Sequence, residues 1–349
     1  MKTKERIELL SKLKPILDHI VSQKMWSGYD LGINEDEYQK LLDTVVRAKV
    51  MNPWFVQESV FESFRGFSSW LTENQLTNWV ENYQTNPKTP KKVAIIMAGN
   101  IPMVGFHDMI SVFLSGHKAV CKLSSDDNIL LPALIDILTL FNPDIKNWIE
   151  FSDAQLPKFD AVIATGSDNS AVYFQSYFGK YPHIIRKNRT SVAVISGNET
   201  QEELSEIGKD IFTYFGLGCR NVSKIFVPKD FVLDRFFEAI VGYGEVVNHN
   251  KYANNYDYNK AVYLMNVQPI LDNNFVLLKE EESLHSPLGV VFYSRYANAS
   301  ELEKYLEQNK ENIQAIIGQD FIPFGKAQCP SLNDYADGVD TMKFLESLS

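Results

Sequence analysis

Val93-Ala94-Ile95-Ile96-Met97 is a short run of apolar side chains with the length of one buried β-strand. A segment with helical character, Met103–Leu114, follows it, and a second apolar run occupies Ala119–Leu123. The alternation continues with a helix predicted over Asn128–Phe141 and a strand over Phe159–Ala164. Strands that alternate with helices in this way are typical of a parallel α/β sheet. The fold class predicted from this region is therefore α/β.

The chain on either side of this region is organised differently. Residues 4–86 are predicted to be helical, because leucine and isoleucine recur there at helical spacing, and the proline-marked stretch 86–90 ends them. A helix over Ser170–Phe178 and a strand over Ser191–Ile195 extend the alternation, and a helix over Glu202–Phe215 follows. Later strands are predicted at 224–227, 261–265, 275–278, 290–293 and 314–317. A chain of 349 residues usually forms two domains.

The composition disfavours several classes of protein. The net charge is −10 and the pI is about 5.2, so a nucleic acid is not expected as a partner. The three cysteines, Cys121, Cys219 and Cys329, are odd in number and widely spaced, which argues against a disulfide framework and favours a reducing compartment. The six histidines are scattered without metal-ligand spacing, so no metal site is predicted.

No membrane segment is predicted either. The longest apolar stretch, Ile129–Phe141, is interrupted by a proline and an aspartate and is too short to span a bilayer. The N-terminal residues are charged and amphipathic, unlike the apolar core of a signal peptide. These features predict a soluble, cytoplasmic protein.

Cys219 is the first candidate for chemistry. It follows Gly216-Leu217-Gly218 and precedes a β-prone run, Val222–Val227. Glycines let a backbone turn tightly, and such a turn exposes a thiolate and brings a backbone N–H close to a developing oxyanion. The alternative is a buried structural cysteine, which composition alone makes equally acceptable. The glycine-rich context favours the nucleophile.

Three further candidates stand where strands of the predicted sheet end, the edge at which open α/β sheets bind ligands. Asn100 could donate to an oxyanion, or it could cap the next helix. Gly166 and Ser167 could bind a phosphate at a helix start, although Asp168 would repel it. Lys122 could bind a ribose or its phosphate, or it could be a solvated lysine. No Gly-x-Gly-x-x-Gly fingerprint occurs.

A basic run, Arg186-Lys187-Asn188-Arg189, offers two interpretations. It could attract an anionic substrate such as a coenzyme A thioester, or it could form a solvated loop, and the loop is the favoured interpretation.

Taken in order, these motifs resemble the aldehyde dehydrogenase superfamily over about residues 92–295. Asn100 coincides with the oxyanion asparagine of that family, and Lys122 with its ribose-binding lysine. Thr165-Gly166-Ser167 is similar to its "TGS" phosphate turn. The run from Gly218-Cys219 to Val227 is similar to its nucleophile motif, "GQxCxxxxRIFV".

Within the superfamily the chain most resembles the LuxC-type acyl-CoA reductases. The likeness rests on Asn52-Pro53-Trp54-Phe55, on the stretch 325–330 and on Asp337-Gly338-Val339-Asp340. Aldehyde-oxidising members carry a glutamate base in an "ELGG" motif, where this chain has Arg189-Thr190-Ser191. The "EIFGP" motif with its ribose-binding glutamate is likewise replaced by His285-Ser286-Pro287-Leu288. The region before residue 92 is too short and helical for the family's oligomerisation hairpin.

The resemblance implies an aldehyde-dehydrogenase-like fold of two α/β domains. A cofactor domain would comprise residues 1–195 with the tail 316–349, and a catalytic domain would comprise residues 196–315. It also implies NAD(P)H-dependent reduction of an acyl-CoA, fatty in type, through an acyl-cysteine intermediate. Cys219 would be the nucleophile and Asn100 the oxyanion donor, with the cofactor bound by Lys122, Ser124, Gly166 and Ser167.

Several points stay open at this level. NADPH is the cofactor expected, with NADH as the alternative, because Ser124-Ser125 suits a 2′-phosphate whereas Asp126 suits a free hydroxyl. Two other activities are considered: oxidation of an aldehyde to an acid, and a cofactor-free acyltransferase or acyl carrier that uses the same cysteine. The acyl chain length, the acyl donor and the formation of a homo-oligomer are not determined.

Overall fold

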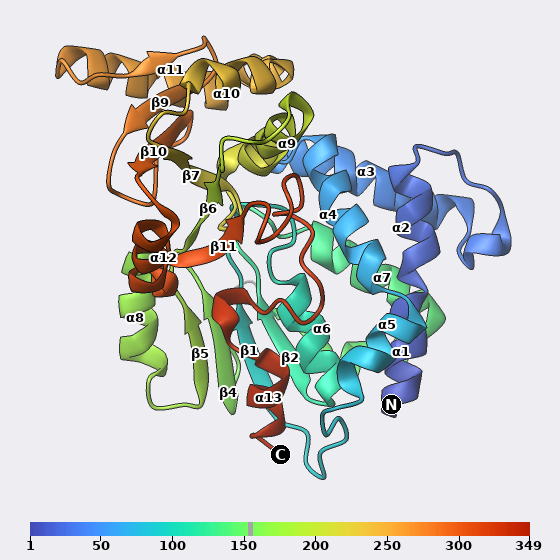
Figure 1. Cartoon of the computed structure of the whole chain (residues 1–349). Coiled ribbons are helices and arrows are strands. Elements are labelled where there is room, and N and C mark those ends of the chain that lie inside the picture. Colours follow the sequence, from blue (N-terminus) through green and yellow to red (C-terminus); the bar gives the residue numbers. More distant parts are fainter. Residues whose placement is uncertain (153–155) are drawn as a thin grey trace. The chain divides into compact units, whose positions relative to one another are not determined.

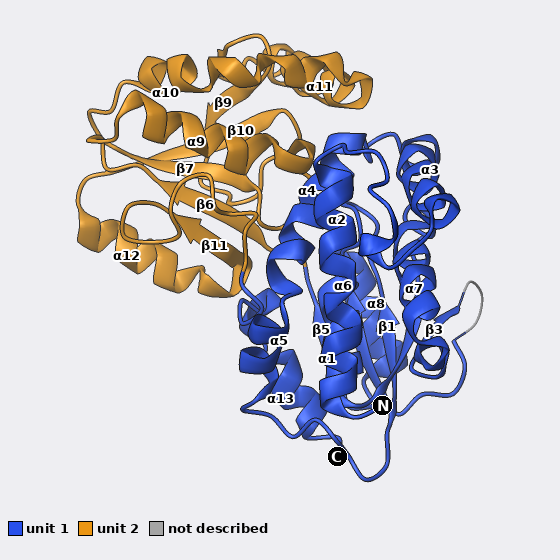
Figure 2. Cartoon of the chain, turned by 90° about the vertical axis from the view of Figure 1, so that its right-hand side faces the viewer, with its two compact units in different colours: residues 1–187, 331–349 blue, residues 188–330 orange. Residues whose placement is uncertain are grey.

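The structure is a computed structural model that describes residues 1–152 and 156–349 (Figure 1). The chain divides into two compact units (Figure 2). The first unit comprises residues 1–187 and 331–349, and the second comprises residues 188–330.

The N-terminal part of the first unit is helical, as predicted. Several starts are set locally: the Asn34 side chain accepts a hydrogen bond of 2.9 Å from the Glu37 N–H and so caps α3, and Thr72 caps α5 in the same manner at 3.1 Å. The apolar faces of these helices share one core with one face of the first sheet. The helices are α1 (Thr3–Ser11), α2 (Leu13–Val21), α3 (Glu35–Met51), α4 (Gln57–Trp70) and α5 (Glu73–Val80).

The first sheet has five strands in the order β3-β2-β1-β4-β5, and all pairings are parallel. Ile96 at the end of β1 is in register with Lys122 of β2 and with Ala164 of β4, so these strands end at one edge. The chain leaves β1 toward β2 and later returns to pair β4 on the other side, which makes the β1/β4 border the switch point where such sheets bind ligands. The strands are β1 (Lys92–Ile96), β2 (Lys118–Lys122), β3 (Ile149–Ser152), β4 (Ala161–Thr165) and β5 (His183–Arg186).

Helices cover both faces of this sheet. The side chains of α6 (Phe106–Ser115) and α7 (Leu130–Phe141) join the core with the N-terminal helices. Phe174 and Phe178 of α8 (Asp168–Phe178) pack on the opposite face. The C-terminal helix α13 (Thr341–Glu346) packs against α6, so the end of the chain belongs to the first unit.

The second sheet has six strands in the order β11-β6-β7-β10-β9-β8, parallel except for β8. The predicted border between residues 195 and 196 differs from this arrangement, because β6 pairs with β7 and β11 and so lies in the second unit. The strands are β6 (Thr190–Val194), β7 (Val222–Pro228), β8 (Leu271–Asp272), β9 (Leu277–Glu280), β10 (Val290–Tyr296) and β11 (Ile313–Ile317), and the helices are α9 (Gln201–Phe212), α10 (Leu233–Ile240), α11 (Asn250–Met265) and α12 (Ala299–Gln308).

The strand predicted over Ala261–Met265 is wrong, because these residues form the last turns of α11. The apolar run is too short to distinguish a strand from a helix by its periodicity. The buried residues of α11 are Tyr252, Tyr256 and Asn259, and their spacing of four and three residues is that of one helical face. The helix was therefore indicated by residues that precede the apolar run.

Candidate active site

Cys219 lies exposed on a turn of the second unit, just before β7. The Asn221 N–H closes the turn by donating a hydrogen bond of 3.0 Å to the Gly218 carbonyl. The Cys219 carbonyl accepts a hydrogen bond of 3.0 Å from the hydroxyl of Ser191, a buried residue of β6. The alternative of a buried structural cysteine is therefore wrong for Cys219, although it holds for Cys121.

The segment that leads to this turn is strained. The helix predicted as far as Phe215 ends at Phe212, and Tyr214 and Phe215 then adopt left-handed backbone angles, with φ of 53° and 57°. Gly216 continues in the left-handed region at 82°. A left-handed residue other than glycine costs roughly 1–3 kcal/mol and persists only where its surroundings impose it. The approach to Cys219 is therefore imposed by tertiary contacts.

A buried carboxylate on α9 fastens a distant part of the second unit beside this segment. Asp210 is fully buried and accepts hydrogen bonds of 2.7 Å from the Gly325 N–H and 2.9 Å from the Ala327 N–H. The guanidinium of Arg220, next to Cys219, donates to the Ala327 carbonyl. Burial raises the pKa of Asp210 to about 6, although the two N–H groups favour the charged form. The stretch 325–330 thus packs beside the Cys219 turn.

This raised pKa predicts a pH-dependent contribution to stability. The folded state binds the Asp210 proton more tightly than the unfolded chain, so the stabilisation is complete below about pH 4 and is lost as the pH rises through about 6. We expect the unfolding free energy of the wild type, relative to Asp210→Asn, to fall by up to roughly 3 kcal/mol between pH 4 and 7. Urea unfolding at several pH values measures it. Asp257→Asn, which changes an exposed carboxylate of the same unit, should show no such trend, and a relative stability that rises with pH would contradict the assignment.

Asn100 lies exposed in the loop after β1. The alternative role as a helix cap is wrong, because α6 begins at Phe106 and its N-cap position is Gly105. The amide of Asn52 donates a hydrogen bond of 3.4 Å to the Gly99 carbonyl, so the Asn-Pro-Trp-Phe stretch contacts the Asn100 loop. A side chain at Gly99 would lie 2.5 Å from the Ser124 Oγ, so this backbone packs directly on the loop after β2.

A second contact ties the same two loops together. The carboxylate of Asp127, after β2, accepts a hydrogen bond of 2.5 Å from the Met103 N–H in the Asn100 loop. Met103 has a left-handed backbone with φ of 58°, so this hydrogen bond holds a strained residue in place. Burial raises the pKa of Asp127 to about 6. Lys122 ends β2 and pairs with β1 and β3, so Lys122, Ser124 and the Asn100 loop are neighbours at one sheet edge.

Gly166 and Ser167 join β4 to α8 at the same edge. Ser167 is the N-cap of α8, and its hydroxyl accepts a hydrogen bond of 3.2 Å from the Ser170 N–H. A side chain at Gly166 would lie 2.8 Å from the Ser170 Cβ, so the strand must enter the helix through a residue that lacks one. A helix start can bind an anion through the N–H groups of its first turn, and here the Ser170 N–H is already used by Ser167. Asp168 is the first residue of that helix.

The structure thus brings five of the six predicted site residues to one edge of the first sheet: Asn100, Lys122, Ser124, Gly166 and Ser167. Cys219 belongs to the second unit. No local sequence pattern indicates Asp127, Asp210 or Asn221, because each acts through partners that are distant in sequence or through backbone groups.

The predicted solvated or anion-binding loop at Arg186-Lys187-Asn188-Arg189 is wrong for its first residue. Arg186 is buried and forms an ion pair with Asp108 of α6. It also donates a hydrogen bond of 3.0 Å to the Thr341 hydroxyl at the start of α13. A buried guanidinium is retained where it is paired in this way, so Arg186 holds the C-terminal helix in the first unit.

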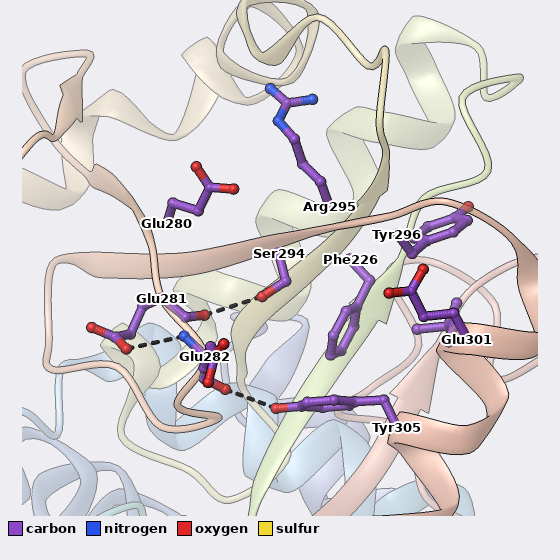
Figure 3. A pocket seen from close by; sticks show the side chains of 10 residues that line it. Phe226, Glu280, Glu281, Glu282, Ser294, Arg295, Tyr296, Glu301 and Tyr305 are labelled. Carbon is purple, nitrogen blue, oxygen red and sulfur yellow. Dashed lines mark hydrogen bonds between the residues drawn. The ribbon is translucent and has the colours of Figure 1, made fainter.

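A cavity of about 560 Å³ opens in the second unit (Figure 3). Its wall carries four glutamates, among them Glu280 and Glu301, with Arg295 as a cation. None of the six predicted site residues lines it. Clustered carboxylates repel an anionic ligand such as a nucleotide or a coenzyme, so this cavity is not the candidate active site.

Within residues 1–152 and 156–349, histidine, cysteine and carboxylate side chains do not gather into a group of three that could hold a metal ion. Over the same ranges, every helix is too short or too polar to cross a membrane.

Comparison with solved structures defines the class of fold. Aldehyde dehydrogenase 21 from Physcomitrella patens, in complex with succinate, matches 92% of this chain and 74% of its own, with a TM-score of 0.63 and 12% identity. An aldehyde dehydrogenase from Bacillus cereus, in complex with NAD⁺, matches 91% of this chain and 72% of its own, with a TM-score of 0.58 and 14% identity. The protein has the aldehyde dehydrogenase fold.

Comparison of sequences defines the family within that class. The profile of the family described as acyl-CoA reductase (LuxC) matches residues 55–242, which include all six predicted site residues. The protein belongs to this family. A long-chain acyl-protein thioester reductase 2 from Photobacterium leiognathi is 23% identical over 193 residues, which cover 49% of this chain and 40% of the relative. The match therefore spans less than half of that curated relative.

Proposed function

We propose that this protein reduces an acyl-coenzyme A thioester, fatty in type, to the aldehyde with NADPH through an acyl-Cys219 intermediate. The observation that carries the proposal is an exposed Cys219 on a hydrogen-bonded turn in a chain of the LuxC family. Thiols presented on such turns are accessible to an acyl carbon, whereas structural cysteines are buried.

The chemistry of the first step follows from the groups at Cys219 and Asn100. The Cys219 thiolate forms a C–S bond to the acyl carbon, the C–S bond to coenzyme A breaks, and the coenzyme leaves as its thiolate. The Asn100 amide and the Cys219 N–H would donate to the oxyanion of the tetrahedral intermediate. The Ser191 hydroxyl holds the Cys219 carbonyl, which keeps the peptide on that side of the turn in place.

The carboxyl edge of the first sheet suits a nicotinamide cofactor. Its donors are one cation, Lys122, the hydroxyl of Ser124 and the N–H groups at the start of α8 after Gly166-Ser167. This donor set matches a diphosphate with ribose hydroxyls, and it stands beside the switch point of a parallel sheet. When bound, the cofactor would supply the hydride that releases the acyl group as the aldehyde. NADH is the alternative to NADPH, because Asp126 is exposed in the same loop.

The replacement of the family's base supports reduction over oxidation to an acid. Hydrolysis of an acyl-cysteine needs a base that activates water. At the matching stretch, Arg189 pairs with Glu311, and the Thr190 hydroxyl lies 2.6 Å from the Ser223 hydroxyl. The Ser191 hydroxyl donates a hydrogen bond to the Cys219 carbonyl, as described above. These side chains are engaged in contacts of β6 with its neighbours, and this stretch contains no carboxylate that could activate water. The acyl-cysteine would therefore react with hydride in preference to water.

The proposal is tested by mixing the full-length protein with NADPH and a series of short-, medium- and long-chain acyl-CoA thioesters. We expect the absorbance of the reduced cofactor to fall only when an acyl-CoA is present, with an aldehyde as product. Omitting the cofactor should leave an acyl group on the Cys219 peptide, detected by mass spectrometry. NADH in parallel gives the coenzyme preference.

Two results would overturn the proposal in different ways. Oxidation of an aldehyde to the acid without coenzyme A would show a dehydrogenase. An acyl-Cys219 adduct together with no binding of either nicotinamide would show an acyltransferase or acyl carrier.

A further inference from the structure

One buried side chain contacts both ends of the segment that presents Cys219. Asn221 is 3% exposed, and its amide nitrogen faces the carbonyl oxygens of Asp210, Ile211 and Thr213 at 3.1, 3.1 and 2.7 Å. These carbonyls belong to the end of α9, where helical partners run out. The two N–H bonds of one amide group therefore serve three acceptors that the helix leaves unsatisfied.

The other half of the same side chain closes the Cys219 turn. The Asn221 Oδ1 accepts a hydrogen bond of 2.8 Å from the Gly218 N–H, while the Asn221 N–H donates to the Gly218 carbonyl at 3.0 Å. Residues 218 and 221 are thus joined twice, and Cys219 and Arg220 are the two central residues of the turn. This reciprocal pair fixes the peptide before Cys219 through the Gly218 carbonyl, and the peptide after Cys219 is held by the Ser191 hydroxyl.

The strained residues lie between these two anchor points. Tyr214, Phe215 and Gly216 are all left-handed, and such a run persists only where contacts on both sides impose it. Asn221 contacts the chain before the run, at Thr213, and after it, at Gly218. All of these groups lie in the second unit.

From this arrangement we infer that Asn221 is a positioning residue for the Cys219 nucleophile: its amide ties the end of α9 to the turn and sets the direction of the Cys219 thiol and N–H. The inference rests on the proposed function, because it assigns Asn221 a task in that reaction. An amide is needed because it donates on one side and accepts on the other, which a carboxylate or an aliphatic side chain cannot do. Asn221 itself touches no reacting atom.

The test is Asn221→Asp, which keeps the shape and the acceptor but turns the donor toward three carbonyls into a carboxylate oxygen. We expect kcat for acyl-CoA reduction to fall about 10²-fold near pH 8, as for a misplaced reacting group. The KM for the nicotinamide should stay at the wild-type value, because the proposed cofactor residues lie in the first unit. The deficit should narrow at lower pH, where a protonated carboxyl group regains one donor.

A matched control is Asn259→Asp. Asn259 is also buried in the second unit, and its amide donates to the carbonyls of Asn255 and Leu288, both at 2.9 Å. This variant should keep the kcat of the wild type. An equal loss in both variants would mean that any buried amide matters to the fold alone, and it would overturn the inference.

Thiol alkylation separates this inference from the proposed function, because it needs no acyl substrate. Iodoacetamide labels Cys219 and the exposed Cys329 in the same molecule, and peptide mass spectrometry compares their rates. We expect Asn221→Asp to slow the labelling of Cys219 about tenfold relative to the labelling of Cys329, because the thiol is no longer held in its exposed position on the turn. An unchanged ratio of the Cys219 and Cys329 labelling rates would overturn the inference. The expected slowing of Cys219, together with a wild type that does not reduce acyl-CoA, would count against the proposed function only.

Hydrogen exchange on the wild type covers the case in which Asn221→Asp does not fold. The N–H groups of Gly218 and Asn221 should exchange far more slowly than in an unstructured peptide, because both are hydrogen-bonded within the turn. Exchange at the rate of an unstructured peptide would overturn the inference.

Discussion

Cys219→Ala should reduce acyl-CoA-dependent oxidation of the nicotinamide by roughly 10⁴- to 10⁶-fold, the range found when a catalytic nucleophile is removed. The physical reason is that no C–S bond to the acyl carbon can form without the thiol. The rate of NADPH consumption in the presence of acyl-CoA measures it. The acyl adduct on the peptide that contains residue 219 should vanish with the activity.

Cys329→Ala is the matched control for this experiment. Cys329 is likewise an exposed cysteine of the second unit and lies in the stretch that packs beside the Cys219 turn. Its removal should leave the rate near that of the wild type. Undiminished turnover in Cys219→Ala, or a comparable loss in Cys329→Ala, would refute the assignment of Cys219 as the nucleophile.

Asn100→Ala should lower the rate of acyl transfer to Cys219 by about 10²- to 10³-fold, which corresponds to about 3–4 kcal/mol of transition-state stabilisation from one oxyanion donor. The role as a cap of α6 does not compete with this expectation, because that helix begins at Phe106. Single-turnover formation of the acyl-enzyme measures the effect. The dissociation constant of the cofactor should stay nearly unchanged.

Asn128→Ala, another exposed asparagine of the first unit, is the control for side-chain removal. It should acylate at the wild-type rate. A large loss of cofactor binding in Asn100→Ala, with an unchanged rate of Cys219 acylation, would contradict the proposal. It would show that Asn100 binds the cofactor and does not donate to the oxyanion.

Most of the first sheet was predictable from local sequence, and the failures have a common cause. β1, β2 and β4 are central strands, so each is a nearly continuous apolar run bounded by polar residues. β3 and β5 stand at the two sheet edges, and neither was predicted. The residues of β5 alternate in burial and include His183 and Arg186, and β3 has a single buried residue, Ile149, so the signal of a buried strand is weak in both.

In the candidate site, too, some residues are indicated by local sequence and others depend on tertiary contacts. Asn100, Lys122 and Gly166-Ser167 are candidates from sequence because the end of each strand is local information, and parallel register brings these ends to one edge. The return of residues 331–349 to the first unit depends on contacts such as Arg186 with Asp108 and Thr341, which no local pattern encodes.

The sequence by itself determined the α/β class, the LuxC resemblance that the family profile confirms, and the residues with suitable chemistry at the strand ends and in the glycine-rich turn. Only the tertiary structure decided that α9 ends at Phe212, that Cys219 is exposed, and that Asn221 joins the helix end to the turn. The physical reason is that periodicity and turn chemistry are properties of neighbouring residues, whereas left-handed backbone and buried polar side chains are stable only through the partners that folding supplies.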